Sequence, residues 1–358
     1  MEKEYFSVTD YSAESASPAE PEIGAISSYT QLTTALTTMV EQHQEEAQLQ
    51  FNNYTGSISD DIAEACWQLK STNALGAYVV DYISYDISRI VTYYQATVYI
   101  NYTRSADEMA EIKSVGANKI ADTVVEAVSS GKQHVAMKIY TSAIDGSAMA
   151  ERVERALTDA PALVPVMPEL NVSVFSGSSS QHIFDVEFMY SASEDEMNQM
   201  RSELENTIKS SAQMISQNKP YSVAVLAAHL IADHCVYKSD DTAGTAYDAL
   251  VLGVGDSRAI AMAYDALCTA KGLESYVVSG LKNNEQHYWN QVKVDDYWYH
   301  VDVTEVKGLS ANAAFLKNDA EMVNDYRWDE LDYPSCDGPS FIVMAEETGS
   351  DTTEENAG

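Results

Sequence analysis

A helix is predicted to begin within the stretch Gly255-Asp256-Ser257-Arg258-Ala259-Ile260-Ala261. Asp256 or Ser257 can act as its N-cap, because side-chain oxygens accept hydrogen bonds from the free N–H groups of a first helical turn. Apolar residues then recur at helical spacing as far as Thr269, and Gly272 follows as a terminator. The positive end of the helix dipole stabilises a thiolate or a developing oxyanion, so Ser257 stands where a nucleophile would act.

Downstream of this helix the sequence predicts a β-hairpin. Residues 287–294 and 297–304 alternate as strands do, with Asp295-Asp296 as the turn. If Val294 opposes Tyr297, period-2 geometry puts one set of side chains on a half-buried face: His287, Trp289, Gln291, Trp298, His300 and Asp302. The opposite face is expected to pack in the core, with Val292, Val294, Val301 and Val303. His287 and Asp302 become diagonal neighbours, roughly 7–8 Å apart at the backbone and within reach of a side-chain hydrogen bond.

Ser257, His287 and Asp302 supply an oxygen, an imidazole and a carboxylate in that chain order. This set is typical of a nucleophile, a general base and an acid that orients the base. Each residue also has an ordinary structural explanation, since serine is a frequent N-cap and a lone strand histidine is commonly part of a core. The pairing of His287 with Asp302 between two tryptophans favours a site.

Together, these motifs resemble the bacterial transglutaminase-like superfamily, which is similar to papain-type cysteine proteases. The quoted motifs are 245–257, His287-Tyr288-Trp289-Asn290 and Trp298-Tyr299-His300-Val301-Asp302-Val303-Thr304. The family uses a Cys at a helix N-terminus, a His that opens an H-x-W-x strand, and an Asp in a W-x-x-V/L-D-x-T strand. The likeness covers roughly residues 221–341, and implies a papain-like α+β fold for this part of the chain.

The resemblance also implies roles for individual residues. His287 would be the general base, Asp302 its orienting partner, and Ser257 the residue at the nucleophile position, because Ala261 and Ala263 match the small residues that follow the family's Cys. Four further residues are expected at the cleft or in contact with substrate: Tyr237, Asp256, Trp289 and Trp298. No metal ligand and no cofactor is implied.

Serine in place of cysteine changes the expected chemistry. A helix terminus and a protonated histidine can turn a thiol into a standing thiolate, whereas a serine hydroxyl must lose its proton during attack. General-base assistance contributes only about 10²–10⁴-fold, which does not replace an intrinsically reactive thiolate. Ala259 and Glu305 also stand where the family has Gly and often has Trp. Cys268 cannot substitute for Ser257, because eleven residues of helix separate them by about 16 Å.

The remainder of the chain is predicted to form two tandem α+β modules. Residues at an offset of 88 match, including Leu36 with Val124, Tyr102 with Tyr190 and Met109 with Met197. Strands are expected at 78–83 and 90–102 in the first copy. The predicted organisation is a flexible Ser/Ala/Glu/Pro-rich spacer (1–29), module 1 (30–115), module 2 (116–208), a transglutaminase-like domain (209–345) and an acidic disordered tail (346–358). The modules carry no clustered catalytic residues.

Charge and composition narrow the class of partner. The chain has 358 residues, with 21 Lys and Arg against 55 Asp and Glu, for a net charge of −34. Such a field repels phosphate backbones, so nucleic acid is not expected as a partner. No apolar run is long enough to span a membrane. Four scattered cysteines indicate neither a zinc site nor a dense disulfide framework, and oligomeric state is left open.

Three functions remain open at this stage. The first is a catalytically impaired transglutaminase-like protein that binds a peptide, a protein or a peptidoglycan-like polymer. The second is a working amide or peptide-bond hydrolase, or acyl transferase, with a Ser257-His287-Asp302 triad. The third is a purely structural surface protein. The spacer favours an extracellular or cell-envelope location, with the cytoplasm as the alternative.

Overall fold

The computed structural model describes residues 25–177, 180–239, 244–306 and 314–341. Most of the predicted spacer and all of the predicted acidic tail lie outside these residues. The chain divides into two compact units, the first comprising Met1–Ile112 with Phe175–Ile183 and the second Lys113–Val174 with Phe184–Gly358. Within the described ranges, no helix combines the length and apolar character needed to cross a membrane.

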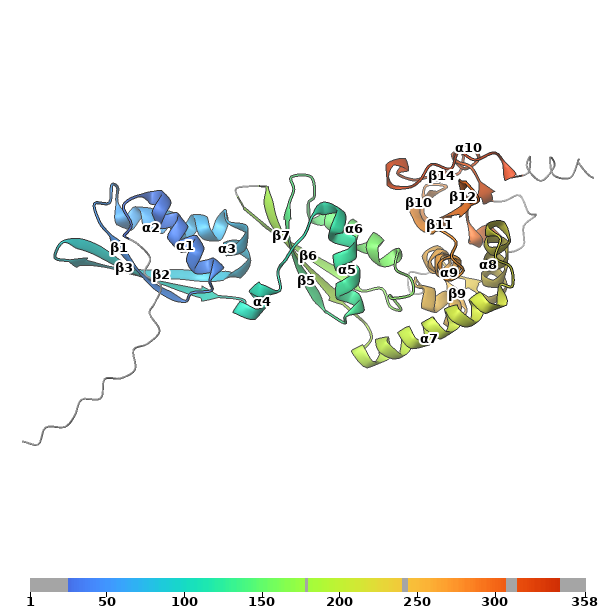
Figure 1. The fold of residues 1–358 in the computed structure, drawn as a ribbon, viewed down its shortest axis with the longest axis horizontal. Coiled ribbons are helices and arrows are strands. Elements are labelled where there is room, and N and C mark those ends of the chain that lie inside the picture. The colour runs from blue at the N-terminus through green and yellow to red at the C-terminus, as the bar shows by residue number, and fades with distance from the viewer. Residues whose placement is uncertain (1–24, 178–179, 240–243, 307–313, 342–358) are drawn as a thin grey trace, which may run out of the picture. The chain divides into compact units, whose positions relative to one another are not determined.

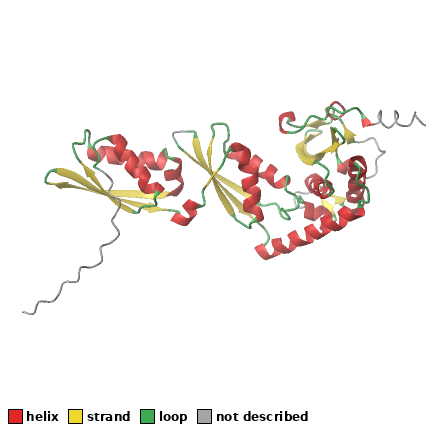
Figure 2. Cartoon of the chain, viewed as in Figure 1, coloured by secondary structure: helices red, strands yellow, loops and turns green. Residues whose placement is uncertain are grey.

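The first unit is a three-stranded antiparallel sheet with helices on one face (Figures 1 and 2). Its elements are α1 (Tyr29–Glu41), β1 (Glu46–Phe51), α2 (Ile58–Ser71), α3 (Ala74–Val79), β2 (Val80–Ile90), β3 (Tyr93–Tyr102) and α4 (Ala106–Ala110). The strand order is β1-β3-β2. Leu49 pairs with Ala96 across β1 and β3, and both are fully buried, as are Leu32 and Leu36 on α1. Apolar residues at helical and alternating spacing therefore meet in one core.

Three predicted strand limits in this unit are wrong: both ends of the strand predicted at 78–83, and the start of the strand predicted at 90–102, which begins at Tyr93. Tyr78 and Val79 belong to helix α3, because the Asn73 side chain caps that helix by accepting a hydrogen bond from the Gly76 N–H at 2.9 Å. β2 then runs as far as Ile90, instead of ending at residue 83. β2 is an edge strand with polar residues on both faces, so its sequence lacks the clean alternation that marks a half-buried strand.

The second unit begins with a mixed sheet in the order β4-β5-β7-β6. Its elements are β4 (Lys113–Ser114), η1 (Ala117–Lys119), α5 (Ile120–Ser129), β5 (His134–Tyr140), α6 (Gly146–Thr158), β6 (Glu169–Ser176) and β7 (Gln181–Met189). Val124 on α5 and Val153 on α6 pack with Met137 and Phe184 of the sheet. The order helix, strand, helix, strand, strand occurs in the segment that forms this sheet and in the segment that forms the sheet of the first unit. That the two segments arose by duplication stays a prediction.

The remainder of the second unit packs helices against a five-stranded sheet. The helical elements are α7 (Glu194–Met214), α8 (Pro220–His234), η2 (Asp248–Leu252), α9 (Ser257–Ala270), η3 (Val303–Glu305), α10 (Asp319–Met322) and η4 (Glu330–Asp332). The strands are β8 (Val236–Tyr237), β9 (Val254–Gly255), β10 (Ser275–Lys282), β11 (Glu285–Val294), β12 (Tyr297–Val301), β13 (Phe315–Lys317) and β14 (Tyr326–Arg327). The sheet order is β13-β12-β11-β10-β14, and β8 pairs separately with β9.

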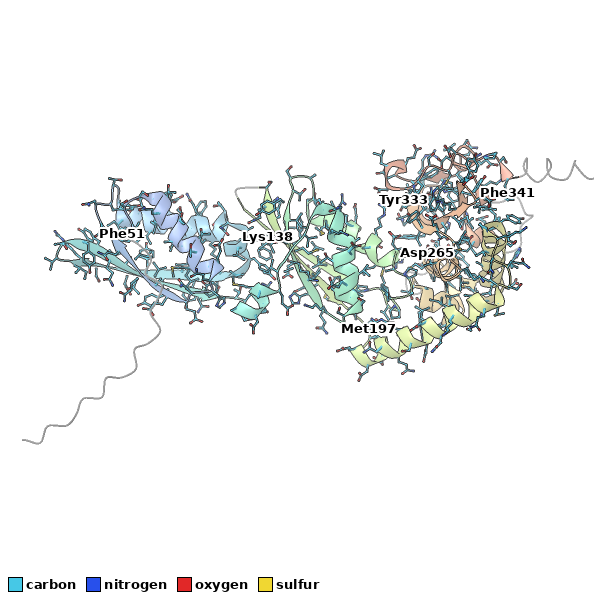
Figure 3. The ribbon with its side chains drawn as sticks, in the orientation of Figure 1. Phe51, Lys138, Met197, Asp265, Tyr333 and Phe341 are labelled. Atoms are coloured by element: carbon cyan, nitrogen blue, oxygen red, sulfur yellow. The ribbon has the colours of Figure 1, made fainter. Side chains whose placement is uncertain are left out.

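Helix α9 is the centre of this part of the fold. Eleven of its fourteen residues are buried. The small side chains of Ala259, Ala261 and Ala263 let the helix approach both α8 and the sheet closely. One buried residue of this helix carries a carboxyl group: Asp265 lies in this region of the second unit (Figure 3). The core thus fixes the beginning of α9 against strand β11.

Candidate active site

The helix start places Ser257 at the first position of α9. Asp256 is the N-cap, and its Oδ1 accepts a hydrogen bond from the Ala259 N–H at 2.8 Å, as the sequence predicted. Ser257 is only 7% exposed. Its Oγ accepts a hydrogen bond from the backbone N–H of Tyr288 at 3.2 Å. Ser257 is therefore held against strand β11, one residue along from His287.

The hairpin forms with the register that the sequence predicts. Val294 pairs with Tyr297 and Lys293 with Trp298. Strand β12 ends at Val301, and Asp302 then caps the short helix η3. The Nε2 atom of His287 lies 2.8 Å from Oδ2 of Asp302. Because a carboxylate only accepts hydrogen bonds, Nε2 carries the proton of this hydrogen bond. Nδ1 is then the ring nitrogen that can accept a proton.

Asp302 is completely buried and its carboxylate is saturated with donors. Oδ2 accepts from His287, from Lys282 Nζ at 3.2 Å and from Tyr326 Oη at 2.8 Å. Oδ1 accepts from the backbone N–H of Thr304 at 3.0 Å and from its hydroxyl at 2.6 Å. Burial alone would raise the pKa of Asp302, but His287, Lys282 and Thr304 together lower it to about 2. Asp302 is therefore a fixed anion at neutral pH.

The face of the hairpin that carries His287 is buried more deeply than expected. Trp289 is 1% exposed, so it does not line an open cleft as predicted. It packs with Tyr326 and Met322 from the segment that follows the hairpin, and its ring stacks near His287 with centroids 6.3 Å apart. The C-terminal segment supplies this cover, which the hairpin pattern alone could not reveal. Trp289 is therefore a buried packing partner of the His287 ring.

Trp298 is also not where the cleft prediction put it. It lies opposite Lys293, six residues along β11 from His287, which corresponds to about 20 Å of extended strand. Its ring stacks on Tyr276 at 5.1 Å. The predicted face is right, but the site occupies only one end of the hairpin.

Tyr237 does lie near the site. Its backbone pairs with Gly255, directly before Asp256, and its side chain is 48% exposed. Burial and then the negative charges of Asp256 and Asp302 raise the pKa of its hydroxyl. Tyr237 is thus a neutral hydrogen-bonding group at the rim of the site.

Two partners of Asp302 were not found from the sequence. Lys282 ends β10, and it forms ion pairs with both Asp302 and Glu305. Tyr326 comes from β14, and burial and the nearby Asp302 carboxylate raise the pKa of its hydroxyl. The one available signal was Glu305, an acid where the resemblance leads one to expect tryptophan, because a partly buried acid favours a nearby cation.

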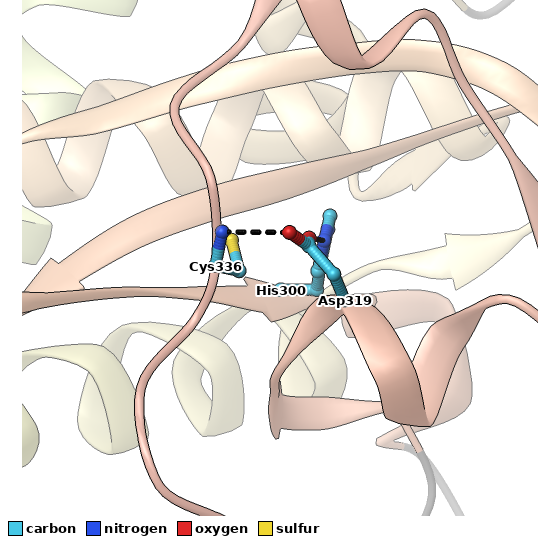
Figure 4. A group of neighbouring side chains, drawn as sticks. All are labelled: His300, Asp319 and Cys336. Atoms are coloured by element: carbon cyan, nitrogen blue, oxygen red, sulfur yellow. Dashed lines mark hydrogen bonds and ion pairs between the residues drawn. The ribbon is translucent and has the colours of Figure 1, made fainter.

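His300 and Asp319 form a second histidine–carboxylate pair (Figure 4). His300 Nε2 is 2.8 Å from Asp319 Oδ1, whose other oxygen accepts from the Cys336 backbone N–H at 3.0 Å. Possible ligand atoms of these three residues lie within 4.8 Å of one another. However, Trp289 Nε1–H donates to His300 Nδ1 at 2.9 Å, so the ring proton is on Nε2 and blocks that ligand position. Burial raises the pKa of the Cys336 thiol, which stays neutral. The cluster is explained as a hydrogen-bonded support for Trp289.

The arrangement has the parts of an acyl-transfer site. Ser257 is at a helix start, where backbone N–H groups of the first turn lack intrahelical partners. His287 is oriented through Nε2 by a fixed anion, which leaves Nδ1 for proton transfer. Among the described residues, no hydrogen bond joins Ser257 Oγ to the His287 ring.

Residues 209–303 match the family described as the transglutaminase-like superfamily. One similar solved structure is a candidate cysteine protease from Cytophaga hutchinsonii. It has 15% identity over 39% of this chain and 63% of that chain, with TM-score 0.27. A protein named as a TGase has 13% identity, over 57% of this chain and 56% of that one, with TM-score 0.27. A candidate protease from Parabacteroides distasonis has 8% identity, over 74% and 61%, with TM-score 0.23.

The chain therefore spans 63% and 56% of the length of the first two of these relatives. A search of curated proteins found no match. The family match covers both the α9 start with Ser257 and the hairpin with His287 and Asp302. The chain thus contains a transglutaminase-like superfamily domain at residues 209–303.

Proposed function

We propose that this domain binds a peptide, a protein or a peptidoglycan-like polymer at the site of Ser257, His287 and Asp302, and that it turns the ligand over slowly or not at all. The observation that carries the proposal is the state of Ser257. Its Oγ accepts from the Tyr288 N–H, and no hydrogen bond to His287 is found among the described residues. A base that is to deprotonate a hydroxyl must be within hydrogen-bond reach of it.

The electrostatics of Asp302 support the same proposal. Its negative charge is shared between His287 and Lys282, and Lys282 also pairs with Glu305. A positive charge close to Asp302 weakens the support that the carboxylate gives to a protonated His287 during proton transfer. A serine site needs this support, because its imidazolium forms only while the hydroxyl loses its proton during attack.

The exposed groups at the rim are consistent with binding. Tyr237 is half exposed and its backbone pairs with Gly255, so its hydroxyl offers a donor and an acceptor for a peptide backbone. The proposal also includes an extracellular or cell-envelope location for the protein, with modules 1 and 2 as tandem spacers. A measurement of ligand binding tests the proposal directly.

The experiment follows hydrogen exchange across residues 232–239 and 284–294 while a peptidoglycan-derived muropeptide or a glutamine-containing peptide is added. The proposal expects protection of both segments, with the peptide recovered intact by mass spectrometry. Tyr237→Ala should reduce the protection, whereas Tyr297→Ala, an exposed tyrosine at the far end of the hairpin, should not. Unchanged exchange at saturating peptide would contradict binding and would favour a purely structural role.

A working serine triad is the second candidate. The 2.8 Å contact between His287 and Asp302 favours it, because this pair is the element that every such triad requires. A fluorophosphonate probe should then label Ser257, and His287→Ala should abolish labelling. Labelling that survives His287→Ala, or none at all, would exclude this candidate.

A further inference from the structure

The carboxylate of Glu154, a residue outside the family match, contacts a sequence neighbour of Ser257 and a sequence neighbour of His287. Glu154 lies on α6, and its Oε1 accepts from Arg258 Nη1 at 2.9 Å. The same oxygen lies 3.4 Å from the Tyr288 hydroxyl, which donates to it. Arg258 directly follows Ser257, and Tyr288 directly follows His287. Glu154 thus contacts the neighbours of both the nucleophile position and the base.

Arg258 is fixed by more than this ion pair. Its Nε donates to the Gly244 carbonyl at 3.1 Å, and its guanidinium lies 5.7 Å from the centroid of the Tyr288 ring. A side chain at Gly244 would meet the guanidinium at 2.5 Å, so glycine leaves the space that Arg258 occupies. The arginine side chain is 17% exposed and that of Glu154 is 44% exposed. A planar guanidinium held on three sides transmits the position of its partner to its own backbone.

A second contact from α6 reaches Ser279, the strand partner of Tyr288, through Tyr333. Arg155 pairs with Asp332 at 2.6 Å, and its guanidinium lies 4.4 Å from the Tyr333 ring centroid. Tyr333 Oη accepts from the backbone N–H of Ser279 at 3.0 Å. Ser279 is the strand partner of Tyr288 in β10 and β11. Helix α6 is therefore linked to the strand pair at two points, directly at Tyr288 and through Tyr333 at Ser279.

The consequence for the site follows from the Tyr288 backbone. The N–H of Tyr288 donates to Ser257 Oγ, so it couples the start of α9 to the strand that carries His287. Any shift of Tyr288 or Arg258 changes the spacing between the nucleophile position and the base. Displacements of about 1 Å at such a spacing can reduce a rate by about 10²-fold.

We propose that Glu154 is a positioning residue of the candidate site, which holds Arg258 and Tyr288 so that Ser257 and His287 keep a fixed relative placement. Module 2 is then a functional part of the site as well as a neighbour of the domain. The inference rests on the proposed function in one respect: it takes the positions of Ser257 and His287 as the place of chemistry.

The test uses the full chain with Ser257→Cys, and compares added Glu154→Gln with added Glu151→Gln. Glu151 is exposed on the same helix, and its substitution removes the same charge. The readouts are the pH–rate profile for iodoacetamide alkylation of the introduced thiol, followed by peptide mapping, and hydrogen exchange of the 284–290 segment. Glu154→Gln is expected to slow alkylation about tenfold, to shift the profile to higher pH and to speed exchange, while Glu151→Gln leaves all three unchanged.

Equal profiles and equal exchange for the two variants would overturn the proposal. If the Ser257→Cys parent shows no alkylation that depends on His287, chemistry at this site is refuted while ligand binding is not, and exchange in the otherwise native chain decides the inference alone. Faster exchange with Glu154→Gln then still supports positioning, and unchanged exchange refutes it. Matching melting temperatures for the two variants separate this effect from a general loss of stability.

Discussion

The Nε2 atom of His287 lies 2.8 Å from Oδ2 of Asp302, and this contact decides which ring nitrogen can take part in chemistry. The carboxylate holds the proton on Nε2, so Nδ1 is the basic nitrogen. In the same buried pocket, Asp302 also accepts from Lys282 and Tyr326. The orientation of the base is therefore well fixed, whereas its electrostatic support is divided.

Removing the positive charge of Lys282 should strengthen that support. In a Ser257→Cys background, Lys282→Met leaves the charge of Asp302 to His287, so the thiolate–imidazolium pair forms at lower pH. The midpoint of the alkylation pH–rate profile is expected to fall by about half a pH unit or more. Lys293→Met is the matched control, because Lys293 pairs with Glu274 far from Asp302. A midpoint that stays in place or rises would contradict a shared Asp302 charge.

Tyr326→Phe should destabilise the domain without changing its packing. The variant loses only the hydroxyl that donates to Asp302 at 2.8 Å. A hydrogen bond to a buried charge contributes about 1–3 kcal/mol, and that loss is expected in the free energy of unfolding measured with urea near neutral pH. Tyr297→Phe removes an exposed hydroxyl and should change stability by less than about 0.5 kcal/mol. Equal effects of the two substitutions would count against the Asp302 network.

Asp265 on α9 should make stability fall as the pH rises. Burial, and then the negative charge of Asp159, raise the pKa of Asp265 to about 7. The folded state therefore binds a proton that the unfolded chain has already released, and stability is lost between the unfolded value near 4 and about 7.

Asp265→Asn removes this titration. Its stability advantage over the parent should grow by up to about 3 kcal/mol between roughly pH 5 and pH 8, measured by urea unfolding at each pH. Asp233→Asn, at an exposed position near the end of α8, serves as the reference substitution. A constant difference between Asp265→Asn and the parent across this range would show that Asp265 is ionised in the folded state.

The parts of the site that were predictable come from local sequence. The cap at Asp256, the hairpin register and the proximity of His287 to Asp302 follow from periodicity and turn position within about fifty residues. The partners of Asp302 were not predictable, because Lys282 and Tyr326 reach it from separate strands without a spacing signal of their own. Periodicity predicts on which face of a strand a side chain lies, but not how deeply other segments bury that face. The burial of Trp289 was therefore not predicted.

Contacts between distant segments set a similar limit elsewhere. Glu154 precedes Arg258 by more than a hundred residues, and one exposed-looking acid on an amphipathic helix carries no sign of that partner. In the first unit, Tyr78 was predicted in a strand since tyrosine and valine favour strands, but the Asn73 cap favoured a short helix. Local capping prevailed over residue propensity at that position.

We propose that Ser257 holds the nucleophile position of a transglutaminase-like site, where His287 would activate a thiol. Ser257→Cys tests this most directly through the rate of iodoacetamide alkylation at neutral pH, with modified peptides mapped to distinguish the introduced thiol from Cys66, the partly exposed native cysteine. Alkylation is expected to be at least about tenfold faster than for an ordinary thiol, and to return to the ordinary rate when His287→Ala is added. An introduced thiol that reacts at the ordinary rate, whether or not His287 is present, would contradict it.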